Sequence, residues 1–141
     1  MQYVCDAGAS TWFRIETSGE AVLESAAMNH AVERFFRDSH DKATNAYVPP
    51  KTLPVIEQKI GLKAHIQKVM PVFLTLRDKD GGALVTAMLP PAGVDTKTFR
   101  PVIVGPANAD PYPLHADAIA KLAAHFKLTL DPARCYPYRR G

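Results

Sequence analysis

The feature that most constrains this chain is residues 20–46, a stretch that contains neither proline nor glycine. Proline breaks helices and glycine weakens them, so the whole stretch is compatible with one α-helix. At 100° per residue, its apolar side chains fall on one broad face and its charged side chains on the other. The apolar face consists of Ala21, Met28, Val32, Phe35, Phe36, Ala43 and Ala46. The pattern predicts a long amphipathic helix in the N-terminal half.

Two signals set the ends of this helix. Thr17 stands three residues before Glu20, which is the spacing of a capping box, and Pro49 and Pro50 stop the helix at its other end. Roughly 28 helical residues would extend about 42 Å, which exceeds the width of a compact domain of this size. We therefore expect the helix either to break near residues 38–42 or to reach past the sheet towards a partner subunit. Its polar face offers four opposite-charge pairs at i, i+4: Glu33–Arg37, Arg34–Asp38, Arg37–Asp41 and Asp38–Lys42.

Strands are predicted from alternation and from turn residues. Five segments are rich in β-branched, aromatic or alternating apolar residues: 2–6, 11–16, 72–76, 83–88 and 100–104. The first two flank a run of small residues, and the next two flank a turn that contains Gly81 and Gly82. Each of these two pairs is expected to form a hairpin, because glycine readily adopts positive φ in tight turns.

Two further helices are predicted. Thr52 and Pro54 are suited to begin a short second helix that ends near Gly61. For residues 62–70 the sequence leaves two alternatives: a strand, or a continuation of that helix. Residues 114–127 form the last helix, with Lys127 near its end to suit the helix dipole.

The predicted order of elements is ββααβββα. Antiparallel hairpins dominate it, so the fold class is α+β: a mostly antiparallel sheet packed against the long helix and a C-terminal helix. A chain of 141 residues matches the usual size of one domain. We expect a single domain over residues 1–130, followed by a basic and aromatic tail over residues 131–141.

Composition is that of an ordinary globular protein, with 47% hydrophobic and 22% charged residues. No apolar run approaches the roughly 20 residues that span a bilayer, so we expect no membrane partner. The N-terminus has neither the basic nor the apolar region of a secretory signal, which predicts a cytoplasmic protein with reduced cysteines. Residues 1–50 carry four basic and seven acidic side chains (net −3), whereas residues 51–141 carry thirteen and seven (net +6). Such asymmetry occurs in dimers that pair opposite faces, although a solvated surface explains it more simply.

Residue types that carry catalysis or bind metals form no recognisable pattern here. None of the five histidines pairs with another at i, i+4, and neither CxxC nor HExxH occurs. Cys5 and Cys135 lie at opposite ends of the chain, and no glycine-rich phosphate motif is present. The sequence thus assigns no catalytic residue, no metal and no cofactor, and it favours a non-enzymatic protein.

Polar residues suited to ligand binding gather in one proline-stiffened loop before the last predicted helix. They are Asn108, Asp110, Tyr112 and His115. Binding residues often lie on loops held by a rigid scaffold. One hypothesis is therefore an enzyme or small-ligand binder with a pocket between sheet and helices, edged by residues 105–115. The simpler interpretation is a stiff connection in which Asp110 caps a turn.

The main functional prediction concerns association. Phe35, Phe36 and Tyr47 lie towards the part of the long helix that is expected to overhang the sheet, and exposed apolar surface of that kind marks an interface. We expect an interaction module that forms a homo-oligomer, most simply a homodimer. Coverage of these side chains within a single chain is the alternative.

Nucleic acid is a weaker hypothesis. Residues 134–140 combine arginines with tyrosines, and Lys59, Lys63 and Lys68 add a basic stripe. The formal net charge of +3 is too small to indicate nucleic acid by itself.

Overall fold

The structure, a computed structural model, describes residues 1–136. Within them five strands form one sheet in the order β1-β2-β3-β4-β5, and every neighbouring pair is antiparallel. The strands are β1 (Gln2–Ala7), β2 (Ser10–Arg14), β3 (Val72–Arg77), β4 (Ala83–Leu89) and β5 (Val102–Val104). The α-helices are α1 (Ser18–Met28), α2 (Val32–Ala46), α3 (Val55–Val69) and α4 (Tyr112–Phe126). The predicted α+β class with a mostly antiparallel sheet is confirmed.

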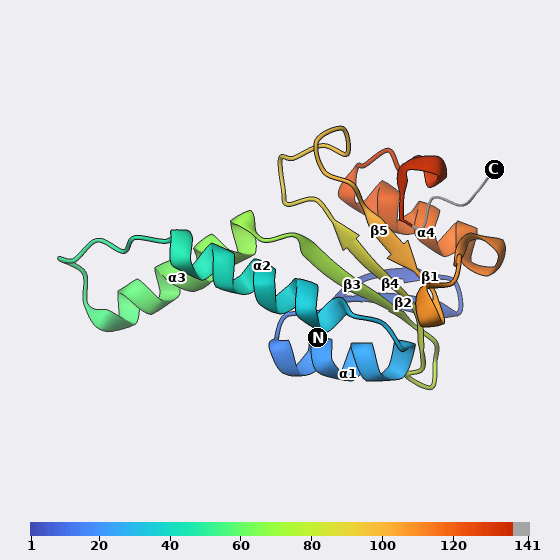
Figure 1. Cartoon of the computed structure of the whole chain (residues 1–141), viewed down its shortest axis with the longest axis horizontal. Coiled ribbons are helices and arrows are strands. Elements are labelled where there is room, and N and C mark those ends of the chain that lie inside the picture. Colours follow the sequence, from blue (N-terminus) through green and yellow to red (C-terminus); the bar gives the residue numbers. More distant parts are fainter. Residues whose placement is uncertain (137–141) are drawn as a thin grey trace.

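The sheet separates two apolar layers (Figure 1). Successive side chains of a strand point to opposite faces, so Phe73 and Leu74 of β3 belong to different layers. Leu74 packs in a cluster with Trp12 and with Leu122 of α4. Phe73 packs against Phe36 of α2, with ring centroids 5.2 Å apart. Helices of the chain itself therefore cover both faces of the sheet.

The predicted long helix is two helices. It breaks at Asn29, whose backbone is left-handed with φ 51°, and not near residues 38–42 as expected. Asparagine tolerates this conformation better than most residues, and the turn lets α2 run back beside α1 (Figure 1). The N-terminal end of α2 is capped from across the turn, because the Ser25 hydroxyl accepts a hydrogen bond from the Glu33 N–H at 2.9 Å.

Residues 55–69 form one continuous helix, α3. The expected short helix ending near Gly61 is therefore wrong, and residues 62–69 continue that helix. Gly61 does not terminate it; the missing side chain makes room for the Tyr47 hydroxyl, which a Cβ at this position would overlap. The glycine is thus a packing residue of the helix pair.

The predicted capping box at the start of α1 is confirmed. Thr17 Oγ1 accepts from the Glu20 N–H, and Glu20 Oε1 accepts from the Thr17 N–H, each at 3.1 Å. The carboxylate of Glu20 also pairs with the amino terminus at Met1. One side chain therefore fixes both the start of α1 and the start of β1.

The expected C-terminal tail is partly integrated into the fold. Cys135 is buried in the core on the α4 side of the sheet, and the Tyr136 carbonyl oxygen accepts from the Ile103 N–H at 3.0 Å. Within the described part of the tail, Cys135 therefore belongs to the core and Tyr136 pairs with the start of β5. The basic residues Arg139 and Arg140, on which the nucleic-acid hypothesis drew, lie outside the described residues.

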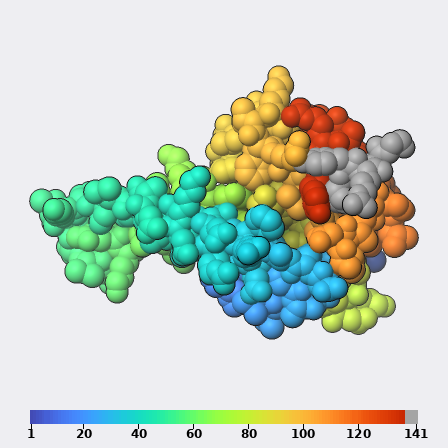
Figure 2. Space-filling view, viewed as in Figure 1, coloured from blue at the N-terminus to red at the C-terminus, as the bar shows by residue number. Residues whose placement is uncertain are grey.

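Past Phe36 the chain leaves the sheet. Residues 37–69, which we call the arm, comprise most of α2, the connection 47–54 and α3; residues 1–36 and 70–136 form the body. The arm projects from one end of the rounded body (Figures 1 and 2). The second half of the predicted helix, α2, therefore reaches past the sheet, which was one of the two alternatives expected from its length. No helix within residues 1–136 is long and apolar enough to cross a bilayer.

Candidate functional sites

The exposed surface of α3 is the first candidate. None of its fifteen residues is buried. Its apolar side chains are Val55, Ile56, Ile60, Leu62, Ala64, Ile66 and Val69. Ile56 and Ile60 are 69% and 64% exposed and lie one turn apart. They occupy a different side of α3 from Gly61 and His65, which contact Tyr47. The arm thus presents branched apolar side chains that the rest of the described chain does not cover.

Charges on the arm are also unpaired. Within residues 1–136 the ion pairs shorter than 4 Å are Met1–Glu20 and Arg77–Glu24, both in the body. The four i, i+4 pairs expected on the polar face of α2 are therefore not formed. The aspartates of α2 and the lysines of α3 have no oppositely charged partner within the described chain, and they remain available to a partner.

The three residues predicted to form an interface have different surroundings. Phe35 is 55% exposed on α2, near the body. Phe36 is only 2% exposed and stacks on Phe73, so it belongs to the core and not to a surface. Tyr47 is partly buried against His65, with ring centroids 5.0 Å apart. It packs the end of α2 against α3, the two helices of the arm. The exposed apolar surface lies on α3, beyond these three residues.

A cavity of about 520 Å³ lies where the arm joins the body, and we call it the basal pocket. Its walls come from the end of β2 and the residues after it, from α2, and from α3 with the two residues that follow it. Its lining consists of Arg14, Ile15, Glu16, Thr17, Phe36, His40, Thr44, Lys59, Leu62, Lys63, Ile66, Gln67, Met70 and Pro71. The pocket is therefore shared between the two parts of the molecule.

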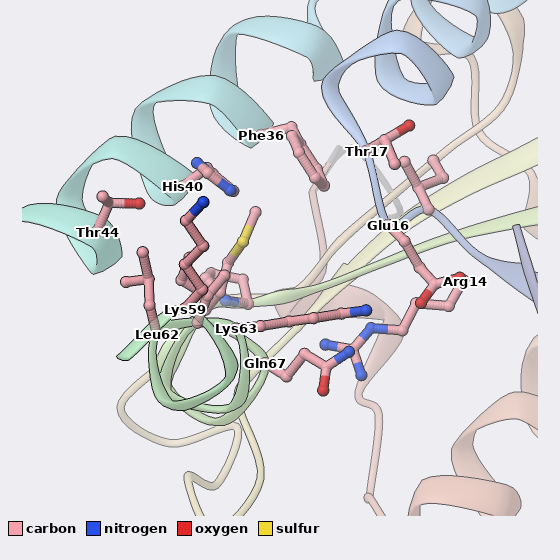
Figure 3. A pocket seen from close by; sticks show the side chains of 14 residues that line it. Arg14, Glu16, Thr17, Phe36, His40, Thr44, Lys59, Leu62, Lys63 and Gln67 are labelled. Carbon is pink, nitrogen blue, oxygen red and sulfur yellow. The ribbon is translucent and has the colours of Figure 1, made fainter. Parts of the chain in front are cut away.

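Four basic side chains and one acidic side chain line the basal pocket. Figure 3 shows the side chains of Arg14, His40, Lys59 and Lys63 extending into the pocket from different elements. The ion pairs of the described residues lie elsewhere, so none of the four basic groups has an acidic partner within 4 Å. Burial lowers the pKa of Arg14, an effect that the charge of Glu16 opposes. The pocket therefore carries an excess of positive charge, which Glu16 compensates in part.

The body contains a buried polar network that the sequence pattern did not indicate. Glu24 on α1 is fully buried. Its Oε1 accepts from Arg77 Nη2 at 2.6 Å, and its Oε2 accepts from the Thr86 hydroxyl at 2.5 Å. Arg77 also donates from Nε to Thr75 Oγ1 at 3.0 Å. Because both carboxylate oxygens accept hydrogen bonds from strands of the sheet, Glu24 anchors α1 to the sheet.

His30 extends this network at its other end. Its Nε2 lies 2.8 Å from Thr86 Oγ1. The Thr86 hydroxyl gives its only hydrogen to Glu24, so the hydrogen-bond pattern assigns the imidazole hydrogen to Nε2, which donates. His30 Nδ1 then accepts from the Val32 N–H at 3.4 Å. Burial lowers the pKa of His30, which favours this neutral form.

The structure places the loop residues predicted to bind a ligand in different surroundings. Asn108 lines a second cavity, of about 270 Å³, together with Phe35 and His30; Asp110, Tyr112 and His115 do not line it. Asp110 Oδ1 accepts from the Tyr112 N–H at 3.1 Å. His115 lies in the first turn of α4. The geometry of Asp110 is that of a turn cap, in keeping with the simpler interpretation of the loop.

The thiols and the metal-ligating residues form no site in this part of the chain. Residues 1–136 contain no group of three or more His, Cys, Asp or Glu side chains that could hold a metal ion. Cys5 and Cys135 do not form a disulfide. Burial raises the pKa of the Cys5 thiol, which lowers the thiolate fraction on which nucleophilic chemistry depends.

No family model, no curated protein and no solved structure matches this chain. The surface of α3 and the basal pocket are therefore the two features from which a function can be inferred, through their geometry and charge.

Proposed function

We propose that this chain is an interaction module that self-associates through its arm. One observation carries the proposal: α3 has seven apolar side chains among fifteen residues, and none of them is buried. A helix in water ordinarily buries its apolar side chains against another element. Within the described chain, α2 covers part of α3, and Ile66 packs against the core cluster of the body. The side of α3 that carries Ile56 and Ile60 stays exposed, so its cover comes from a partner.

A second copy of the chain is the partner that suits the arm. The outer face of α2 carries Asp38 and Asp41, whereas Lys51 and Lys68 lie on the connection and on α3; none of them forms an ion pair within residues 1–136. Packing α3 of one copy against α2 of the other brings these opposite charges together, twice about a twofold axis. Two helical hairpins joined in this way form a four-helix bundle, which buries its apolar side chains in a shared core.

The decisive experiment is the oligomeric state of wild type and of Ile60→Asp, measured by light scattering and sedimentation equilibrium. Wild type is expected to be a dimer at tens of micromolar. An aspartate in the centre of the apolar surface is expected to weaken dimerisation by about 30-fold or more, the effect of losing one strongly contributing interface residue. Because Ile60 is exposed in the single chain, the variant is expected to keep the circular dichroism spectrum of a folded protein.

Leu114→Asp is the matched control. Leu114 is 86% exposed on α4, far from the arm, so the same change of charge and polarity there should leave the dimer intact. A wild-type protein that is monomeric at tens of micromolar, or equal weakening by both variants, would count against self-association through the arm.

A further inference from the structure

We propose that the basal pocket binds a small molecule that carries a phosphate group. The proposal goes beyond self-association and does not depend on it. It rests on the convergence of basic side chains from three separate elements at one concave site: Arg14 from β2, His40 from α2, and Lys59 and Lys63 from α3. None of these groups forms a hydrogen bond or ion pair with its side chain within residues 1–136.

Like charges that point towards one another repel, and folding brings them together only where something compensates them. Lys63 and Arg14 line the same cavity from two different elements (Figure 3), and both side chains are long enough to turn outwards into water instead. Arg14 is also partly buried, which weakens its hydration. An anion between the two groups restores favourable electrostatics and replaces the lost hydrogen bonds to water.

The number of charges favours a phosphate over a single carboxylate. Arg14, Lys59 and Lys63 line the pocket together with a single carboxylate, Glu16, which leaves an excess of positive charge even with histidine counted as neutral. A phosphate monoester carries about −1.5 to −2 charges near neutral pH and offers three acceptor oxygens, so it can engage two cations at once. Arginine binds such a group through two parallel N–H donors, and lysine contributes a point charge.

The remaining lining is suited to the organic part of the ligand. Ile15, Phe36, Leu62, Ile66 and Met70 form the apolar wall, and Gln67 adds a side-chain amide. The buried hydroxyl of Thr44, also in the lining, has no hydrogen-bond partner within the described chain. A volume of about 520 Å³ lies within the usual range of roughly 300–1,000 Å³ for small-molecule sites. A phosphorylated metabolite of nucleotide size therefore matches both the charge and the size of the cavity.

Thermal unfolding with defined probes tests this. Adenosine 5′-monophosphate, adenosine and inorganic phosphate are titrated separately at constant ionic strength. We expect adenosine 5′-monophosphate to raise the Tm by about 5–10 °C at a hundredfold excess over its Kd. Inorganic phosphate is expected to give a smaller rise and adenosine none. If inorganic phosphate raises the Tm as much as the nucleotide does, the apolar wall does not contact the ligand, and that part of the proposal is overturned.

The variants are Arg14→Gln and Lys63→Gln, with Lys68→Gln as the matched control. Lys68 lies on α3 but does not line the pocket. We expect the nucleotide-induced rise to disappear in the first two variants and to persist in the control. Lys63→Gln also removes one positive charge from a cavity that holds an excess of them, so its own Tm without ligand is expected to equal or exceed that of wild type, which separates lost binding from lost folding.

Two results would overturn the proposal: no rise in Tm with adenosine 5′-monophosphate in wild type, or an equal rise in Lys63→Gln and Lys68→Gln. The readout is independent of the dimer. Ile60 does not line the pocket, so Ile60→Asp should retain the wild-type response to the nucleotide whether or not it alters self-association.

Discussion

The body and the arm of this molecule differ in how far their side chains are buried and paired within the chain. In the body even a charged residue is fully buried, because Glu24 finds both an arginine and a hydroxyl on the neighbouring strands. In the arm, α3 buries none of its fifteen residues, and its lysines have no acidic partner within the described chain. The body is therefore stabilised by contacts within the chain, whereas α3 leaves most of its side chains exposed. Each of the following changes tests that contrast.

The largest expected effect is that of Glu24→Ala in the body. The substitution leaves the Arg77 guanidinium without its partner in a site that is only 17% exposed, and removing one member of a buried pair costs about 3–5 kcal/mol. Glu57→Ala in the arm removes an exposed carboxylate from α3 and should change stability by about 0.5 kcal/mol or less. Urea unfolding of both variants measures the difference.

Glu24→Gln refines the same test, since the amide keeps one acceptor for Arg77 without the charge. Its loss of stability should fall between those of wild type and Glu24→Ala. If Glu24→Ala costs no more than Glu57→Ala, the network does not stabilise the body and the contrast with the arm fails.

The body was also the part that the sequence predicted best. Strands were recognised because their side chains alternate between two faces, a local pattern that survives folding. The capping box at Thr17 and Glu20 is local in the same sense. The break at Asn29 was missed although its support is local: the Asn29 N–H donates to the Ser25 carbonyl oxygen in a left-handed cap, and the Ser25 hydroxyl accepts from the Glu33 N–H. The apolar periodicity continues through this cap, so it masked the asparagine as a signal for a helix end.

The candidate sites were harder to predict, because their residues meet only in the folded chain. Lys59 and Lys63 are one helical turn apart and were noticed as a basic stripe, but Arg14 and His40 join them only through the packing of three elements. Glu24 and Arg77 are separated by 53 positions in the sequence. No spacing rule relates such residues, because the contacts depend on how α1, the arm and the sheet are placed in space.

The second prediction concerns acid. Burial lowers the pKa of His30, and the charge of Glu24 acts in the opposite direction without reversing the shift. The folded chain thus binds this proton more weakly than the unfolded chain, whose histidines titrate near about 6.5. The stability associated with neutral His30 is present above that pH and is lost as the pH falls below it, at up to about 1.4 kcal/mol per pH unit.

His30→Gln removes this proton site but keeps a donor for the Thr86 hydroxyl. Between pH 7.5 and 5.5 its unfolding free energy should decline less than that of wild type, by about 1 kcal/mol, as measured by urea unfolding at several pH values. His125→Gln on α4 is the control, because His125 is exposed; its pH profile should run parallel to wild type. Parallel profiles for all three proteins would show that the buried network does not couple the body to pH.

The smallest effect probes whether the arm is stable by itself. In a helix, alanine is more favourable than glycine by about 1 kcal/mol, but at Gly61 the added Cβ overlaps the Tyr47 hydroxyl. Removing that hydroxyl with Tyr47→Phe leaves the nearest ring carbon, Cζ, 3.5 Å from the new methyl group, which is an ordinary contact. Gly61→Ala should therefore stabilise α3 by about 0.5–1 kcal/mol in the Tyr47→Phe background and by less, or not at all, in wild type.

Amide hydrogen exchange shows which elements gain stability. It is measured in the Ile60→Asp background, so that dimerisation does not contribute. Exchange in α3 should slow by about two- to fivefold when Gly61→Ala is added to Tyr47→Phe, the equivalent of that free energy. Exchange in β3 should stay unchanged, because an arm with no buried residue in α3 opens without disturbing the sheet. Equal slowing in β3 would mean that the arm and the body open as one unit. The basal pocket would then be a rigid cleft within one cooperative unit, and not a site between two separately stable parts.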